Sequence, residues 1–111
     1  MKYAYEFIED SFGDLRLFLP EEISLFSDFI ENIATEEQMD EYIGYINNVL
    51  EGVYEDFEIE LNATSIFIEK DVTIVENNFR IEEPYKNTIE TEQLIELLLV
   101  WKEKIHKIFK G

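Results

Sequence analysis

The chain contains no cysteine, and its 111 residues include only two prolines and four glycines. Without cysteine it can form no disulfide, no thiolate metal site and no cysteine nucleophile, which suits a reducing cytosol. Its longest apolar run, residues 97–101, has five members, whereas a membrane-spanning helix needs about 20. The first residues also lack the apolar segment of a secretory signal. We therefore expect a cytoplasmic protein that makes no contact with membranes.

Basic residues are also scarce. Nine Lys and Arg stand against 26 Asp and Glu, which gives a formal net charge of -17. Direct binding of nucleic acid or of an anionic membrane through a basic patch is therefore excluded as a default. The hydrophobic content of 46% and the aromatic content of 14% are too high for a disordered acidic tail. The length predicts one folded domain, residues 1–111.

The acidic residues are concentrated in one part of the chain. Residues 1–69 contain 18 acids and two bases, Lys2 and Arg16, for a net charge of -16. Residues 70–111 contain eight acids and seven bases, for a net charge of -1. Solubility alone does not require this segregation. It predicts a concentrated negative field that steers a cationic partner towards one face of the fold.

The first part of the chain predicts a hairpin and two helices. Residues 3–9 and 15–19 fit short strands around a turn at residues 10–14. Pro20 suits the start of a helix, whose apolar residues repeat at intervals of three and four. A second helix starts at a capping box made by Thr35 and Gln38 and stops at Gly52. The residues expected on the buried stripe of the first helix are Ile23, Phe26, Ile30 and Ile33.

An antiparallel meander and a long helix complete the prediction. Apolar and acidic side chains alternate over residues 56–61, which is typical of a half-buried strand with an acidic outer face. Further strands are expected at residues 64–69, 72–75 and, as an edge strand, 86–90. Thr91 caps the last helix. Its expected buried stripe is Leu94, Leu98, Trp101, Ile105 and Ile108, widened by Ile95, Leu99 and Phe109.

These elements predict an α+β fold. It has an antiparallel sheet, made of the N-terminal strand or hairpin plus the meander, with two helices from the N-terminal half and one long C-terminal helix. One sheet face would be covered by helices. The other would be left to solvent or to a partner.

No pattern in the sequence predicts catalysis. The single histidine, His106, lies among lysines that disfavour a metal ion, and we expect an ordinary surface residue. Residues 10–14 lack the spacing and the closing glutamate of a calcium loop. Acid pairs are frequent, but none is marked by an apolar setting that would raise a pKa. We expect no catalytic residue, no cofactor and no metal, and a small metal-dependent or acid–base enzyme is kept as an alternative of another class.

Two acidic surfaces are candidate partner-binding sites. On the outer face of the meander, acids are combined with aromatic side chains, which suits protein recognition. Acids on neighbouring strands also repel each other by about 0.2–1 kcal/mol, so folding alone should disfavour them. The alternative is a plain solvated face. The sheet surface consists of Tyr54, Asp56, Glu58, Glu60, Phe67 and Glu69, and the helical surface of Glu37, Asp40 and Glu41.

The segment from about residue 50 to residue 110 resembles a known group of proteins. It reads Val49-Leu50-Glu51-Gly52, Phe57-Glu58-Ile59-x-x-Asn62-Ala63, Ile66-x-Ile68 and Ile89-Glu90-Thr91-x-x-Leu94-Ile95-x-Leu97-Leu98-x-x-Trp101. This pattern resembles small acidic bacterial immunity proteins encoded beside polymorphic or contact-dependent growth inhibition toxins. The resemblance implies a cytosolic inhibitor that binds the C-terminal domain of a toxin, often a basic nuclease, and blocks its active site. It carries over no catalytic residue.

The charge distribution and the resemblance lead to one expectation by separate routes. We expect a non-enzymatic immunity protein that binds a cognate basic toxin domain and does not contact nucleic acid directly. The alternative is an acidic nucleic-acid mimic or adaptor that occupies a DNA- or RNA-binding protein, because carboxylates spaced like phosphates would serve there too. The sequence leaves the identity of the toxin and the oligomeric state open.

Overall fold

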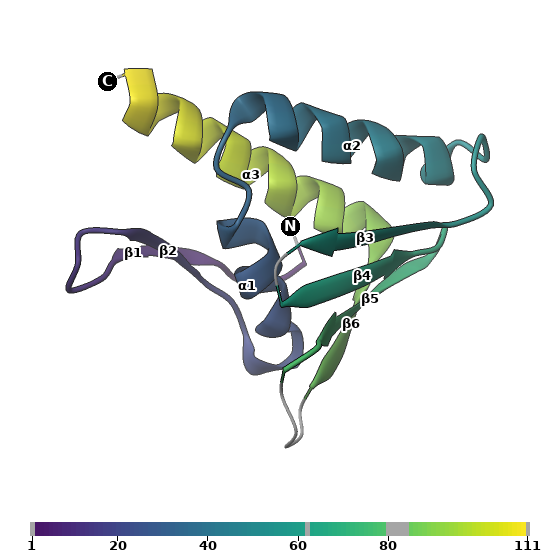
Figure 1. Ribbon diagram of the computed structural model, residues 1–111, viewed down its shortest axis with the longest axis horizontal. Helices are drawn as coiled ribbons and strands as arrows, with labels where there is room; N and C mark the ends of the chain where they lie inside the picture. The colour runs from purple at the N-terminus through teal and green to yellow at the C-terminus, as the bar shows by residue number, and fades with distance from the viewer. Residues whose placement is uncertain (1, 62, 80–84, 111) are drawn as a thin grey trace.

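The computed structural model describes residues 2–61, 63–79 and 85–110, and the side chains of residues 108–110 are outside this description. The predicted α+β fold with a long C-terminal helix is confirmed (Figure 1). Its elements, in chain order, are β1 (Glu6–Glu9), β2 (Leu15–Phe18), the 3₁₀ turn η1 (Glu21–Ile23), α1 (Leu25–Glu31), α2 (Glu36–Leu50), β3 (Phe57–Leu61), β4 (Thr64–Ile68), β5 (Val72–Asn77), β6 (Lys86–Glu90) and α3 (Thr91–Lys110).

The strands form two antiparallel sheets. The meander is a four-stranded sheet in the order β3-β4-β5-β6, and the hairpin β1-β2 forms a sheet of its own. The hairpin projects from the body of the molecule, on the side away from the four-stranded sheet (Figure 1). It is therefore a separate arm rather than an extension of the meander.

The helices cover one face of the four-stranded sheet. Helices α1 and α3 contact its central and β6 strands, while α2 lies along α3 and reaches β3. On the covered face, Ile66, Ile68, Val75 and Ile89 are buried. In the register of the sheet, these residues alternate with residues of the opposite face that are exposed or half-buried, except for Ser65, which is buried. The fold therefore has two layers, and one sheet face is left without a helix in the described part of the chain.

The N-terminal helical region is shorter than the sequence predicts. The expected stripe of Ile23, Phe26, Ile30 and Ile33 is buried. The continuous helix expected from Pro20 is instead a 3₁₀ turn followed by α1, and Ile33 lies beyond the end of α1. The indole N–H of Trp101 donates a 3.0 Å hydrogen bond to the Ile33 carbonyl, so tertiary contacts hold this residue where the helix has stopped.

The predicted cap of α2 is confirmed in its main contact. The hydroxyl of Thr35 accepts a 3.1 Å hydrogen bond from the backbone N–H of Gln38. The side chain of Gln38 reaches back to the N–H of Ala34, at 3.4 Å, rather than to that of Thr35. Gly52 has a φ of 82°, the left-handed stop expected from the sequence.

The buried face of α3 differs from the prediction at Leu99. Leu94, Leu98, Trp101 and Ile105 are buried as expected. Leu99 is instead 48% exposed, and Leu97, which the prediction left out, is fully buried. The predicted stripe members Ile108 and Phe109 lie outside the described side chains. In the part of the chain that the structure describes, no helix has the length and apolar character needed to cross a bilayer.

Candidate protein-binding surfaces

The uncovered sheet face carries a short apolar row flanked by acids. Antiparallel pairing aligns Glu58 with Phe67, Phe67 with Ile74, and Ile74 with Thr88 across all four strands. Phe67 and Ile74 are half-buried, whereas Glu58 is exposed. An apolar centre with a charged rim is the usual anatomy of a protein interface. The structure thus brings the predicted Glu58 and Phe67 together.

A second row runs beside the first. Glu60 pairs with Ser65, and Ser65 pairs with Glu76 on β5. Ser65 is buried, and its hydroxyl accepts a 2.9 Å hydrogen bond from the Asn78 amide and donates one of 3.4 Å to the Glu60 carboxylate. Glu76 and Ile74 belong to this face but escaped prediction. The alternation of Val72, Ile74 and Glu76 along β5 was the available signal, since the three residues point to one side.

The remaining predicted sheet acids lie at the end of the face. Asp56 and Glu69 line one shallow pocket together with Glu55, Lys70 and Asp71. Asp56 and Glu69 are both exposed. Asp56, Glu58, Glu60 and Glu69 form no ion pair with any described residue. Their charges are therefore available to a partner.

Tyr54 does not share this face, which corrects the sequence prediction. Its ring stacks on Phe57 with centroids 5.6 Å apart, and Phe57 contacts Tyr45 of α2 at 4.5 Å. Phe57 is one register position from Glu58 and so points to the helix side of the sheet. Tyr54 precedes β3, which begins at Phe57, so the alternation of the strand does not determine which way its side chain points. Tyr54, 39% exposed, lies at the α2–β3 corner instead.

The β6 side of the face is electrostatically different. Lys86 and Glu90 lie there, and Glu90 forms an ion pair with Lys2. Hydrogen bonds from the Lys2 ammonium and then from the Tyr3 hydroxyl lower the pKa of Glu90 to about 2. The unpaired acids therefore lie along β3, at the β4–β5 turn and, with Glu76, at the far end of β5 opposite Lys86. Together they will be called the acidic sheet face (Asp56, Glu58, Glu60, Glu69 and Glu76).

The helical acids have more partners within the fold. Asp40 forms an ion pair with Lys102 of α3, and the neighbouring Glu36 carboxylate lies 2.8 Å from the His106 ring nitrogen. Glu41 accepts a 2.5 Å hydrogen bond from the Tyr45 hydroxyl, and this bond raises the pKa of Tyr45. Glu37 is exposed and forms no ion pair with a described residue. Of the three predicted helical residues, Glu37 alone therefore keeps an unengaged carboxylate in the described chain.

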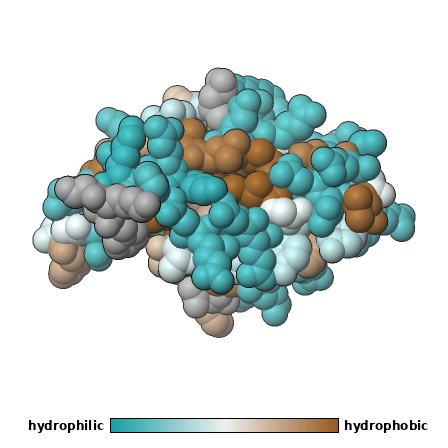
Figure 2. Space-filling view, turned by 90° about the horizontal axis from the view of Figure 1, so that it is seen from above, coloured by the Kyte–Doolittle hydropathy of each residue, from teal (hydrophilic) through white to brown (hydrophobic). Residues whose placement is uncertain are grey.

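The view from above, onto α2 and α3, shows the hydropathy of this side of the molecule (Figure 2). Hydrophilic side chains cover most of this side and surround a central hydrophobic strip (Figure 2). His106 is exposed, as predicted, and its carboxylate neighbour comes from α2 rather than from its own helix. Among the residues that the structure describes, no three His, Asp or Glu side chains converge to hold a metal ion.

Fold and surface together define a small acidic α+β protein with an uncovered, carboxylate-lined sheet face. An immunity protein of Bacillus cereus strain ATCC 14579 is 32% identical to the chain over 114 aligned positions, which span 100% of this chain and 95% of the relative. The chain therefore belongs to the family of this immunity protein. No protein-family model and no solved structure matches it.

Proposed function

We propose that the chain is a non-enzymatic immunity protein that binds and neutralises a cognate cationic toxin domain, most simply a nuclease, by occluding its active site. The observation that carries this proposal is the uneven charge: a net -16 in residues 1–69, with unpaired acids on a sheet face that no described helix covers. A nuclease is the toxin chemistry that fits best, because an active site that binds phosphates is cationic.

Binding would proceed in two physical stages. The unpaired carboxylates first steer the cationic domain, which raises the association rate at low ionic strength. The Phe67–Ile74 pair then loses its remaining contact with water in the complex. Apolar groups at the centre of an interface usually supply most of the binding free energy, while the charged rim sets specificity.

The sheet is a better candidate than the second helix. Asp40 is already paired with Lys102, and Glu41 is hydrogen-bonded by Tyr45. A partner would have to compete with these contacts. On the sheet, Glu58 pairs with Phe67 of the apolar row and forms no ion pair with a described residue, and Glu60 accepts only a long, 3.4 Å hydrogen bond from Ser65.

The test is binding kinetics against the toxin domain encoded beside the gene for this chain. Asp56→Lys combined with Glu58→Lys should slow association and weaken protection. The matched control is Glu22→Lys with Glu96→Lys, two exposed acids outside both candidate surfaces that form no ion pair with a described residue. Both variants change the net charge equally, so the comparison isolates position from total charge.

The expected result is a marked loss of association rate for the sheet variant and a small one for the control, with a steep decline of the wild-type rate as salt increases. Circular dichroism verifies that both variants fold. Equal association rates for the two variants would remove the acidic sheet face from the mechanism. Binding to a DNA- or RNA-binding protein in place of the toxin would favour a nucleic-acid mimic.

A further inference from the structure

The tip of the β1–β2 hairpin presents an aromatic side chain to solvent. Phe12 is 88% exposed. Within the described chain, four of the nine exposed large hydrophobic residues fall between positions 5 and 18. The tip of the hairpin reaches slightly past the end of α3 on the same side of the molecule (Figure 1), and Gly13 and Asp14 at its base line a pocket with Trp101 of α3. A concentration of exposed apolar groups on a projecting element is typical of an interaction site.

The tip, residues 9–14, is ordered by its own hydrogen bonds. One carboxylate oxygen of Asp10 accepts from the N–H groups of Phe12 and Asp14, both at 2.9 Å. The backbone closes the loop through Asp10 N–H to Asp14 O at 2.9 Å and Gly13 N–H to Asp10 O at 3.0 Å. Gly13 has a φ of 82°, which other residues adopt only with strain. Phe12 is thus held outward by a fixed loop.

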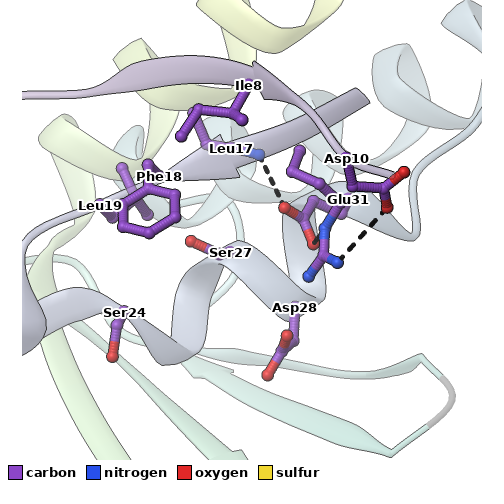
Figure 3. Close-up of a pocket in the computed structure, with 10 residues that line it drawn as sticks. Ile8, Asp10, Leu17, Phe18, Leu19, Ser24, Ser27, Asp28 and Glu31 are labelled. Atoms are coloured by element: carbon purple, nitrogen blue, oxygen red, sulfur yellow. Dashed lines mark hydrogen bonds and ion pairs between the residues drawn. The ribbon is translucent and has the colours of Figure 1, made fainter. Parts of the chain in front are cut away.

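The arm is also fixed to the body of the molecule. Glu31 of α1 accepts hydrogen bonds from the Leu17 N–H at 2.7 Å and from Arg16 Nε at 3.0 Å. The Arg16 guanidinium lies 3.8 Å from the second oxygen of Asp10. Figure 3 shows this chain of contacts from α1 through the hairpin to the base of the tip. A rigid arm loses little conformational freedom when it binds.

The arm is acidic around its aromatic tip. Residues 6–16 contain four acids and one base, and that base, Arg16, is engaged by Glu31 and Asp10. The carboxylates of Glu9 and Asp14 form no ion pair with any described residue. The tip therefore offers one aromatic ring between two uncompensated negative charges.

We propose that the hairpin tip inserts into a cationic, phosphate-binding cleft of the toxin domain, with Phe12 in the place of a stacked base and the carboxylates of Glu9 and Asp14 in the place of phosphates. Nucleic-acid-binding clefts combine basic side chains with aromatic platforms. The basic side chains would pair with the carboxylates of the tip, and the aromatic platform would stack on Phe12. The inference rests on the proposed function and adds the part of the chain that enters the cleft, distinct from the acidic sheet face.

Charge selects this occupant over a second copy of the chain. Two copies, each with a net charge of -17, repel one another, whereas a cationic cleft attracts the tip. In a second copy, a pocket lined by Lys104 and Lys107 at the end of α3 offers positive charge to the tip.

The test compares Phe12→Ala with Phe79→Ala in binding to the same toxin domain. Phe79 is the matched control because it is 80% exposed and lies at the β5–β6 turn, outside the hairpin. We expect Phe12→Ala to dissociate at least about tenfold faster and Phe79→Ala to behave as wild type, with equal melting temperatures for all three. Glu9→Gln with Asp14→Asn should slow association, and a single-stranded oligodeoxynucleotide should compete with the wild-type chain for the toxin domain.

Each other outcome overturns the inference. If Phe12→Ala binds as tightly as wild type while the Asp56 and Glu58 reversal weakens binding, the proposed function stands and the tip does not enter the cleft. If sedimentation shows a wild-type dimer that Phe12→Ala dissociates, the occupant is a second copy. If the wild-type chain does not bind the toxin domain, the proposed function and this inference fail together.

Discussion

The carboxylate of Glu90 accepts hydrogen bonds from the Lys2 ammonium and the Tyr3 hydroxyl. The backbone N–H of Lys2 also donates a 2.9 Å hydrogen bond to the Gln93 side chain. Together these contacts fasten the start of the chain to the junction of β6 and α3. Residues far apart in the sequence meet there. The protonation of Glu90 is therefore coupled to the free energy of unfolding.

Replacing this carboxylate should change how stability depends on pH. The folded pKa of about 2 lies below the ordinary value of 4.5. The ionised group therefore stabilises the folded state above pH 4.5, and that contribution disappears as the pH falls to about 2. Glu90→Gln should be less stable than wild type at neutral pH and equally stable at the acidic limit. Urea unfolding across this range measures the difference.

Glu96→Gln is the control for this prediction. Glu96 is exposed on α3 and forms no ion pair with a described residue. Its substitution should leave the difference from wild type constant across the same pH range. If the loss of stability in Glu90→Gln is as large at the acidic limit as at neutral pH, the negative charge of Glu90 does not stabilise the fold.

At the scale of the elements, the buried face of α3 is decided by its contacts with other elements. Residues 97–101 are apolar without interruption, so a helical period cannot choose between Leu97 and Leu99. The choice is made by α2 and the sheet, which bury Leu97 and Leu98 and leave Leu99 half in solvent.

Adjacent alanine substitutions should reveal this difference. Leu98→Ala should lower the free energy of unfolding by about 2–5 kcal/mol, because a fully buried side chain leaves a cavity. Leu99→Ala removes the same atoms from a position 48% exposed and should cost much less. Guanidinium chloride midpoints check both values. Similar midpoints for the two variants would place the buried face of α3 elsewhere.

Local patterns in the sequence were sufficient for much of the fold. The alternation in β3, the Thr35 cap and the left-handed stop at Gly52 are all fixed by neighbouring residues, and the structure bears them out. The early stop of α1 involves a contact with a distant segment, the hydrogen bond from Trp101 to Ile33. The position of Tyr54 depends on Phe57, whose ring packs on Tyr45 of α2. The exposure of Phe12 also escaped prediction, since turn composition predicts a bend and not what the bend displays.

The candidate site shows the same division. Glu58 and Phe67 were placed on one face by alternation alone, and the register of β3 and β4 aligns them. The pairing of Asp40 with Lys102 joins residues that are 62 positions apart, and no local pattern contains it. The sequence therefore identifies the candidate acidic residues, but it does not predict which of them form ion pairs within the fold.

For the whole molecule, the unpaired negative charge opposes folding. Nine basic side chains stand against 26 acidic ones, and several bases are already engaged in ion pairs. Most carboxylates of the described residues therefore form no ion pair within the fold. Bringing them into a compact domain raises their mutual repulsion relative to the extended chain.

Added sodium chloride should consequently raise the melting temperature. At 0.1 M salt the screening length is about 10 Å, so repulsion between exposed acids weakens over moderate concentrations. A variant with Glu58→Gln and Glu60→Gln should show a smaller rise, because it has less repulsion to screen. Differential scanning calorimetry gives both slopes. A flat or falling wild-type curve would mean that the acids are already compensated within the fold.

Strand β3 is one of the two outer strands of the four-stranded sheet, and it carries Glu58 and Glu60. An outer strand offers unpaired backbone groups on which further chains can stack, the first step of fibril growth. Like charges on two such strands repel, so these acids also guard the sheet against aggregation. Neutralising them to weaken toxin binding would therefore make the protein more prone to form fibrils at high concentration.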